Sequence, residues 1–408
     1  MTFLRVGSAP YCSIHIRELS ALTNRFNRKR QNLVDLQNDV QQLLDDLADN
    51  DIGAGFQAAA YWHGELVLNA CSGSADSAGL RSVDSDTLFI VQSCSKGIVS
   101  TAIHILVQQG KLDYDERISR YWPEFGANGK DKITLRQVLT HTAGVPLMPT
   151  YADMRLITDW RAMVSEMEKL EPIWEPGSKS GYHGLTFGWI LGETASRADG
   201  RTFAQIVHDE ICKPLGIEKG MYLGASSEAE SRIAEISGDA VPIASMPDDM
   251  LFKRVLPPAL VPVANPEWNS PWFHAAAVPA VNVVATAQAL ACMYASLIGH
   301  GVDSGRRLLE PASVMEATSL HFEGVDEVAL APIKLGLGYS LSQDGDTMGG
   351  SPTAFGYAGL GGMIGYADAS NGLAVAVLCN RMKGGRGKRS PDRLVSDLIR
   401  EKLRIAEL

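Results

Sequence analysis

The spacing of apolar residues changes along this chain, and the changes separate helical from strand-like segments. A helical stripe occupies 33–47, where leucine and valine recur every three or four positions. Two strand-like runs follow at 58–62 and 65–71. The dipeptide between them, His63-Gly64, has the glycine that a tight hairpin loop favours. The first part of the chain therefore predicts one helix followed by a β-hairpin.

The middle of the chain is predicted to be mainly helical. Thr134 and Thr202 each precede a glutamine by three residues, which is the spacing of a capping box at a helix start. Gly110 stands where a helix would end, because glycine easily adopts the left-handed conformation of that position. Residues 238–275 are instead rich in proline, aromatic and acidic residues, and we expect a long irregular segment that walls a binding site. Continuous helical patterns cover 94–109, 186–198 and 287–297.

The last part of the chain returns to strand-like spacing before a closing helix at about 392–405. Asn371-Gly372 is a strong turn signal between the second and third of its candidate strands. These candidate strands are 337–341, 363–367 and 373–378. An order of strands, helices, strands and helix predicts an α+β protein. Its antiparallel sheet is built from N- and C-terminal segments, is flanked by helices and carries an inserted, mainly helical lobe.

This reading also divides the chain into predicted domains. Residues 1–30 form an N-terminal extension, 31–110 and 330–408 form the sheet lobe, and 111–329 form the helical lobe. We expect the active site in the cleft between the two lobes, because such clefts are where small molecules usually bind.

The composition argues against several classes of function. The 408 residues are 45% hydrophobic and 21% charged, as in folded soluble proteins, and a net charge of −10 argues against nucleic-acid binding. We see neither a signal peptide nor an apolar stretch as long as a membrane span, so we predict a cytoplasmic protein, although residues 1–30 leave organelle targeting open. The six cysteines are scattered without Cys-x-x-Cys spacing, and we predict no metal and no other cofactor.

Ser93 and Lys96 are the most informative pair of residues. They stand three positions apart at the start of a predicted helix, so their side chains share one face. A serine hydroxyl needs a base to become a nucleophile. A lysine can be that base when burial and the positive end of a helix dipole lower its pKa. The alternative is that Ser93 merely caps the helix and Lys96 is a surface lysine.

Tyr182 is a second candidate, in a proline- and glycine-rich loop, 175–184, that leads into a predicted helix. A phenol beside a lysine ammonium can relay a proton between a serine and a leaving group. An ordinary half-buried tyrosine would fit the same sequence context. The next residue, His183, is a candidate for the lining of a pocket.

A third segment, 355–362, contains four glycines. Glycines allow the backbone to approach another group closely, as at a strand edge whose N–H groups bind a substrate carbonyl oxygen. A glycine-rich bend or bulge is the alternative. We interpret His141 and His104 as structural histidines. The chain has no G-x-S-x-G, phosphate loop, dinucleotide fingerprint or H-E-x-x-H.

These segments occur in the order and approximate spacing of the serine β-lactamase and penicillin-binding-protein superfamily. In detail the chain resembles the β-lactamase-like carboxylesterases, also called family VIII esterases. The resemblance covers roughly residues 33–400. Besides Ser93-x-x-Lys96 and the loop of Tyr182, it rests on segments 109–113, 139–146, 176–177, 305–311, 355–368 and 372–382.

The resemblance implies roles for individual residues. Ser93 would be the acylated nucleophile and Lys96 would take its proton. Tyr182, at the tyrosine of the family's Y-x-N motif, would relay a proton to and from the leaving group. The backbone N–H groups of Ser93 and Leu360 would form the oxyanion hole.

Two departures from the family's pattern bear on the substrate. Gly184 stands where the family has asparagine, and Tyr357 begins a triplet that is K-T-G in the lactamases and often H-x-G in the esterases. Because Tyr357 carries no fixed positive charge, a neutral ester fits this site better than an anionic antibiotic. Substrate contacts are expected from Tyr357, Gly359 and His183.

We therefore predict a serine hydrolase that cleaves a small-molecule carboxylic ester, or acyl donor, through an acyl-Ser93 intermediate. An acyltransferase that passes the acyl group to a small metabolite is the alternative on the same site, and β-lactamase or amidase activity is less favoured. From another class, a non-catalytic scaffold of the same fold stays open. The sequence does not indicate the oligomeric state.

Overall fold

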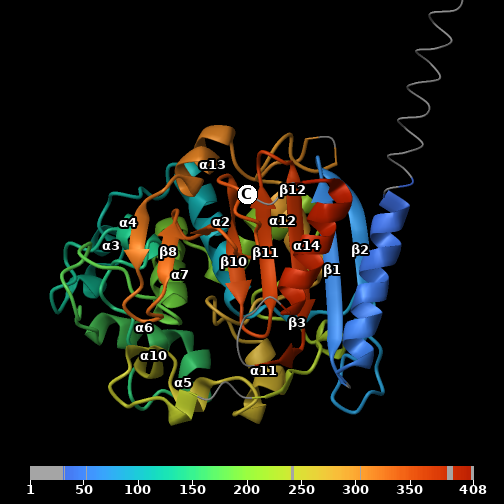
Figure 1. The fold of residues 1–408 in the computed structure, drawn as a ribbon. Coiled ribbons are helices and arrows are strands. Elements are labelled where there is room, and N and C mark those ends of the chain that lie inside the picture. The colour runs from blue at the N-terminus through green and yellow to red at the C-terminus, as the bar shows by residue number, and fades with distance from the viewer. Residues whose placement is uncertain are drawn as a thin grey trace, which may run out of the picture.

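An eight-stranded antiparallel sheet runs through the molecule and combines both ends of the chain (Figure 1). Its strand order is β2-β1-β12-β11-β10-β9-β8-β7. The predicted N-terminal extension lies outside the described residues. The computed structural model describes residues 31, 33–51, 53–239, 243–303, 305–383 and 389–405.

The first and last strands of the sheet in sequence are direct neighbours in space. Phe56 of β1 is opposite Cys379 of β12, and Trp62 is opposite Leu373. All residues of β12 are buried, because helices cover the sheet on both faces. The strands are β1 (Gly55–Trp62), β2 (Glu65–Gly73), β7 (Phe322–Val325), β8 (Pro332–Leu335), β9 (Ser340–Leu341), β10 (Ala354–Gly359), β11 (Met363–Asp368) and β12 (Leu373–Cys379).

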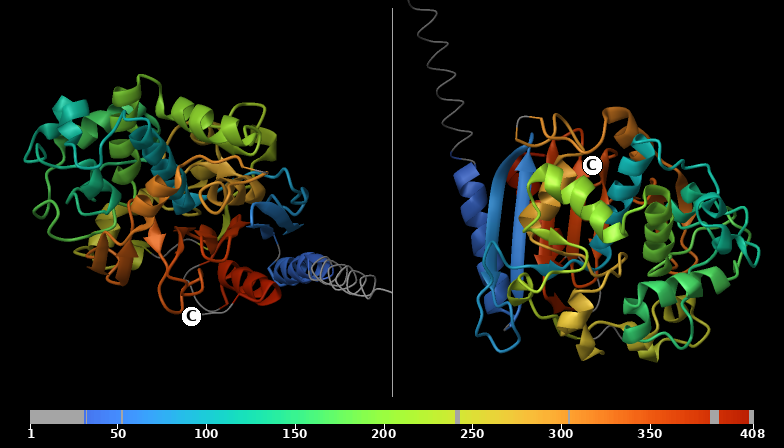
Figure 2. Two further views of the ribbon diagram at one scale, coloured as in Figure 1. Left: turned by 90° about the horizontal axis from the view of Figure 1, so that it is seen from above. Right: turned by 180° about the vertical axis from the view of Figure 1, so that it is seen from behind.

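Helices cover both faces of the sheet (Figures 1 and 2). The helix at 33–49 and α14 (Pro391–Leu403) lie on one face, where Lys402 of α14 forms an ion pair with Asp39. On the opposite face, α12 (Ala287–Ala295) packs on β1, β11 and β12, and α2 (Ser95–Gln108) packs on β10. This second face is the one that carries the candidate site.

Most of the remaining helices gather around α2 and α7, on the side of the sheet away from α14 (Figure 2). The capping boxes predicted at Thr134 and Thr202 are both present. These helices are α3 (Ile118–Tyr121), α4 (Leu135–Leu139), α5 (Met154–Thr158), α6 (Trp160–Lys169), α7 (Thr186–Asp199), α8 (Phe203–Val207), α9 (Lys213–Leu215), α10 (Leu251–Val255), α11 (Pro271–His274) and α13 (Pro311–Thr318).

Short strands tie the segments around Ser93 together. β6 pairs with both β3 and β4, and β5 pairs in parallel with β13. A 3₁₀ turn, η1 (Gln92–Cys94), joins β3 to α2. The short strands are β3 (Phe89–Ile90), β4 (Met221–Tyr222), β5 (Ser237–Gly238), β6 (Val284–Ala285) and β13 (Arg381–Met382).

The predicted α+β class, with a sheet made from both chain ends, is confirmed. The predicted strand at 337–341 is too long, because Gly338 adopts a φ of 75° and only Ser340–Leu341 pair as β9. Strands β7 and β8 were not predicted. The division into a sheet lobe and a helical lobe stays a prediction, and α12, assigned to the helical lobe, packs on the sheet.

Within the described residues, no helix combines the length and apolar character that a membrane crossing requires.

Candidate active site

Ser93 is presented by a sharp turn between β3 and α2. The preceding residue, Gln92, has a φ of 49°, which is uncommon for a residue other than glycine and costs conformational energy. The turn is held by a hydrogen bond from the Val91 N–H to the carbonyl of Val283. Ser93 is therefore partly exposed at the floor of a cavity, while its neighbours in the turn are buried.

Lys96 lies in the first turn of α2, three residues after Ser93, and its side chain is fully buried. Its Nζ is 3.3 Å from the Ser93 Oγ and donates a hydrogen bond to the Ala280 carbonyl at 3.1 Å. Burial lowers the pKa of Lys96 to about 7. The alternative of a surface lysine does not hold, since this amine is withdrawn from water and can be neutral at ordinary pH.

The loop before α7 brings Tyr182 to the same point. The Tyr182 Oη and the Ser93 Oγ are 2.7 Å apart, and the Lys96 Nζ is 4.8 Å from the centre of the tyrosine ring. Hydrogen bonds from the Gly181 N–H to the His141 carbonyl and from the Ser180 hydroxyl to the Thr140 carbonyl fix the loop. The Ser93 hydroxyl therefore contacts both the Lys96 amine and the Tyr182 phenol, and these two side chains lie next to each other.

The end of β10 lies directly against the turn of Ser93. A Cβ built on Gly359 would stand 2.8 Å from the Val91 carbonyl oxygen and 3.2 Å from the Gln92 Cβ, so only glycine permits this approach. Leu360 follows Gly359 and lines the same cavity as Ser93. Within the described chain, no hydrogen bond uses the backbone N–H of either Ser93 or Leu360. Neither group therefore has a backbone partner among the described residues that would compete with an oxyanion, and the oxyanion hole stays a prediction.

The structure changes the interpretation of the two histidines near this site. His183 was predicted to contact substrate, but it is fully buried and outside the cavity lining. Its Nδ1 donates to the Gly181 carbonyl at 2.7 Å, and its Nε2 accepts from the Val145 N–H. His183 is therefore a structural histidine of the tyrosine loop, and the prediction is corrected.

His141 was interpreted as purely structural, yet it lines the cavity. Its Nε2 lies 3.0 Å from the hydroxyl of Tyr357, which also lines the cavity as predicted. The two residues are 216 positions apart, so no local pattern signalled that they meet. His104 packs as expected, since its ring nitrogens contact the Tyr114 hydroxyl and the Leu337 carbonyl.

The cavity in front of Ser93 has a volume of about 440 Å³ and a mostly apolar wall. The irregular segment predicted at 238–275 supplies much of this wall, including Trp268. Trp272 is outside the cavity lining and stacks under the Arg155 guanidinium, 3.8 Å from the ring centre. The apolar lining residues are Leu185, Phe252, Val255, Leu256, Pro262, Trp268, Val281, Ala329, Ile333, Leu335, Ala358 and Leu360.

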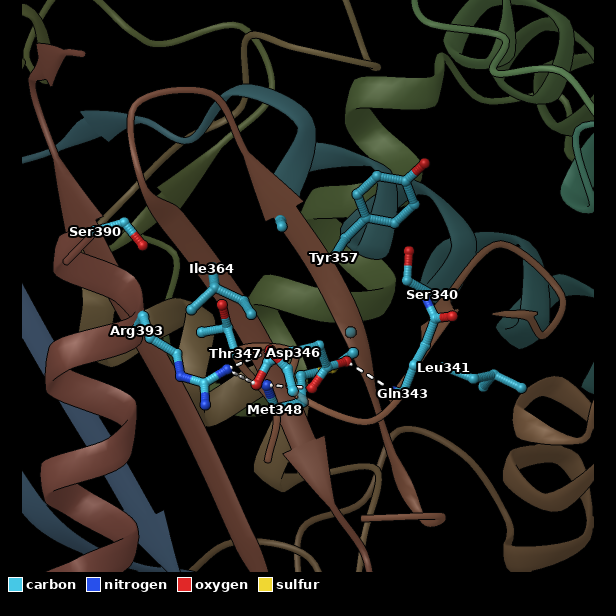
Figure 3. Close-up of a pocket in the computed structure, with 13 residues that line it drawn as sticks. Ser340, Leu341, Gln343, Asp346, Thr347, Met348, Tyr357, Ile364, Ser390 and Arg393 are labelled. Atoms are coloured by element: carbon cyan, nitrogen blue, oxygen red, sulfur yellow. Dashed lines mark hydrogen bonds between the residues drawn. The ribbon is translucent and has the colours of Figure 1, made fainter. Parts of the chain in front are cut away.

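A second cavity, of about 450 Å³, lies against β10 beside the Arg393 side chain (Figure 3). Arg393 donates to the Gly345 carbonyl, and the ring of Tyr357 points away from this arginine, toward the helical side (Figure 3). Neither Ser93 nor Lys96 nor Tyr182 lines this cavity. Because the two cavities have similar volumes, the cavity in front of Ser93 is the candidate active site on account of its reactive groups and not of its size.

The arrangement can perform acyl transfer. A serine with a neutral amine and a phenol in reach has the parts that nucleophilic attack on a carbonyl needs. In the described part of the chain, no three His, Cys, Asp or Glu residues are grouped so that they could hold a metal ion.

Known proteins are similar to this chain in sequence and in fold. The sequence matches the Beta-lactamase family over residues 40–398. The Esterase/beta-lactamase LipL of Mycobacterium tuberculosis is 33% identical over 346 residues, which cover 80% of this chain and 77% of that protein.

Two solved structures cover 90% of this chain. A family VIII carboxylesterase has a TM-score of 0.77 at 27% identity over 97% of its length. A novel penicillin-binding-protein homologue from Caulobacter crescentus has a TM-score of 0.78 at 28% identity over 96% of its length. These likenesses confirm the resemblance that the motifs predicted.

Proposed function

The chain belongs to the Beta-lactamase family, and from this membership we propose that it is a serine carboxylesterase working through an acyl-Ser93 intermediate. The observation that carries the proposal is the contact of the Ser93 Oγ with the Tyr182 Oη at 2.7 Å and the Lys96 Nζ at 3.3 Å. The lowered pKa of Lys96, about 7, supports a basic role for its amine. Relatives named as esterases support a hydrolase.

Acylation begins when neutral Lys96 takes the hydroxyl proton of Ser93, directly or through Tyr182. The Ser93 Oγ then forms a bond to the ester carbonyl carbon, and the oxyanion accepts hydrogen bonds from the backbone N–H groups of Ser93 and Leu360. As the bond to the alkoxy oxygen breaks, Tyr182 gives that oxygen a proton and recovers one from the Lys96 ammonium. An alcohol leaves and an acyl-serine remains.

Deacylation repeats the same steps with water. Water loses a proton to the Lys96 and Tyr182 pair and attacks the acyl carbon, and the Ser93 oxygen leaves as a hydroxyl after taking that proton back. The products are a carboxylic acid and the resting enzyme. Every proton is returned, so the cycle consumes only ester and water.

The cavity favours an uncharged ester. Among the described residues that line it there is no lysine or arginine, and Asp326 is the one acidic residue. An anionic substrate would find no such side chain in this lining to pair with, which is costly in an apolar site. We therefore favour ester hydrolysis over hydrolysis of an anionic lactam.

Intact-mass spectrometry with a fluorophosphonate, together with turnover of p-nitrophenyl butyrate, tests this function. We expect the wild type to hydrolyse the ester and gain one probe mass, and Ser93→Ala to do neither. Ser85→Ala, at an exposed serine, is the matched control and should behave as the wild type. Labelling that survives Ser93→Ala would remove Ser93 as the nucleophile. A wild type that neither labels nor turns over the ester would favour the scaffold.

Acyl transfer is the second candidate, because the apolar wall around Phe252 and Trp268 suits an organic acceptor as well as an acyl group. Adding butan-1-ol to the same assay separates the two functions. A butyl ester that accumulates at the expense of free acid identifies a transferase, whereas an unchanged yield of acid identifies a hydrolase.

A further inference from the structure

His141 is built into the cavity wall in an unusual conformation. Its φ is 57°, in the left-handed region that residues other than glycine seldom adopt, and its side chain is buried. The imidazole packs between the rings of Tyr182, at 5.4 Å, and Phe187, at 5.0 Å between ring centres. A strained backbone at a cavity wall suggests a specific task for the side chain.

The hydrogen bonds of His141 fix which nitrogen carries the proton. The Nδ1 lies 3.2 Å from the backbone nitrogen of His183, and because a backbone N–H can only donate, this Nδ1 is an acceptor without a proton. The Nε2 of the neutral ring therefore bears the hydrogen and donates it to the Tyr357 hydroxyl at 3.0 Å. Burial, with His183 and Lys96 nearby, holds the pKa of His141 well below its usual range, which keeps the ring neutral.

This bond determines what Tyr357 can offer to a substrate. A hydroxyl that accepts from His141 has its own hydrogen to donate, and its oxygen is fixed in place by a residue of another element. Tyr357 lies on β10, three residues before Leu360, and both residues line the same cavity as Ser93. The ring of Tyr357 is centred 5.7 Å from the Lys96 Nζ, so its hydroxyl is a neutral donor in the wall beside the reactive group.

We propose that His141 positions Tyr357 as a neutral hydrogen-bond donor, so that the enzyme prefers uncharged esters carrying a second oxygen near the scissile bond. Ether, hydroxyl and carbonyl oxygens have the required lone pair without a charge. This inference rests on the proposed esterase function and adds a substrate class to it. In it, Tyr357 contacts the substrate, whereas His141 is a positioning residue that acts through Tyr357.

Pairs of esters that differ by one oxygen test the inference. On the acyl side, p-nitrophenyl 3-methoxypropanoate is compared with p-nitrophenyl pentanoate, which has a methylene in place of the ether oxygen. On the alcohol side, 2-methoxyethyl butyrate is compared with butyl butyrate. In the wild type we expect a higher kcat/KM for the oxygenated ester of at least one pair, by about fivefold to tenfold, the value of one hydrogen bond.

In Tyr357→Phe we expect this preference to disappear, because phenylalanine keeps the ring and removes the donor. The ratio of the two kcat/KM values is the readout, since general damage to the fold lowers both rates and leaves their ratio unchanged. A wild-type ratio of one in both pairs, or a Tyr357→Phe ratio equal to that of the wild type, overturns the inference and leaves the acyl-Ser93 mechanism in place. A wild type that hydrolyses none of these esters contradicts the proposed function itself.

The role of His141 has its own pair of variants. His141→Asn suits the left-handed backbone but is too short to reach Tyr357, whereas His141→Gln places an amide N–H near the position of the Nε2. We expect His141→Asn to lose the preference for the oxygenated ester and His141→Gln to restore part of it. The double variant His141→Asn/Tyr357→Phe should have the same ratio as Tyr357→Phe alone. A full preference in His141→Asn would show that Tyr357 needs no positioning by this residue.

Discussion

At the scale of single residues, the state of one amine decides how the site works. Lys96 has no ion pair among the described residues, and its Nζ contacts only a hydroxyl and a carbonyl oxygen in the hydrogen bonds that surround it. Withdrawal from water is the main cause of its lowered pKa. Burial without a carboxylate partner among the described residues is thus what would make this lysine the base of the proposed mechanism.

The first prediction is a rate that rises with pH. Only neutral Lys96 can accept a proton, and its neutral fraction grows as pH rises toward the pKa of about 7. The kcat/KM for p-nitrophenyl butyrate should therefore increase about tenfold per pH unit below that pKa and level off above it. Lys96→Ala should lose about 100- to 10,000-fold in rate and should lose this rise as well. A wild-type rate that is flat from pH 5 to 7 would contradict the assignment.

Gly184 shows how one residue shapes the cavity. A Cβ at this position would lie 2.8 Å from the Val255 Cγ1 and 3.3 Å from the Tyr182 ring, so the space of the family's asparagine is occupied by α10. We expect Gly184→Ala to lower the free energy of unfolding by about 1–3 kcal/mol, as overpacking does. Urea denaturation measures this loss.

The matched test of that prediction is the double variant Gly184→Ala/Val255→Ala. Its loss in the free energy of unfolding should be smaller than the sum of the losses of Gly184→Ala and Val255→Ala. The reason is that alanine at position 255 removes the side-chain atom with which the new Cβ would clash. Losses that simply add would show that the two positions do not compete for space.

At the scale of elements, the connection between β7 and β8 supports the loop of Tyr182. Asp326, at 3% exposure, accepts hydrogen bonds from the N–H groups of Val328 and Ala329. A further bond from the Tyr182 backbone lowers the pKa of this carboxyl, although burial raises it overall. The Glu327 N–H donates to the Ser180 carbonyl. The β7–β8 hairpin thus holds the loop of Tyr182 through hydrogen bonds to the backbone of that loop.

We predict that Asp326→Ala lowers kcat for p-nitrophenyl butyrate by about tenfold or more, since small displacements of a reacting group are costly. The loss should be smaller in Asp326→Asn, which keeps one acceptor oxygen. Glu327→Gln removes only an exposed ion pair with Lys179 and is the control. Equal rates in Asp326→Ala and Glu327→Gln would mean that the hairpin does not position Tyr182.

At the scale of the whole molecule, segments from the two ends of the chain pack together in one sheet. β1 is hydrogen-bonded to β12, and α14 covers the outer face of β11 and β12 beside the helix at 33–49 (Figure 1). The side chains of Val395 and Ile399 on α14 are fully buried. The segment that carries the active site lies between these ends in sequence, so we expect the sheet and the site to unfold together.

Ile399→Ala tests this expectation far from the site. We predict a loss of about 2–5 kcal/mol in the free energy of unfolding, from the lost burial and the cavity left behind. The loss of activity and the change in tryptophan fluorescence should occur in the same urea transition. Glu401→Ala, on the exposed side of α14, should change stability by less than about 0.5 kcal/mol. Two separate transitions would show that the site is stable without the covered sheet.

The sequence by itself determined what local geometry controls. Ser93 and Lys96 face each other because a helix places residues three positions apart on one side, whatever surrounds them. The hairpin at His63-Gly64 and the capping boxes form for the same reason, since their partners are within a few residues. The α+β class followed from the grouping of such segments along the chain.

The tertiary structure alone decided which distant residues meet. Tyr182 reaches Ser93 across 89 positions, a contact that only the family resemblance had implied, and His141 reaches Tyr357 across 216. The packing of loops and strands sets both contacts. Periodicity carries no information on such pairs, so the sequence placed His183 in the pocket and left His141 out. Strands β7 and β8 were missed for a related reason, because short strands at a sheet edge depend on their partners more than on their own pattern. Long-range packing therefore made the cavity, and local spacing supplied the chemistry inside it.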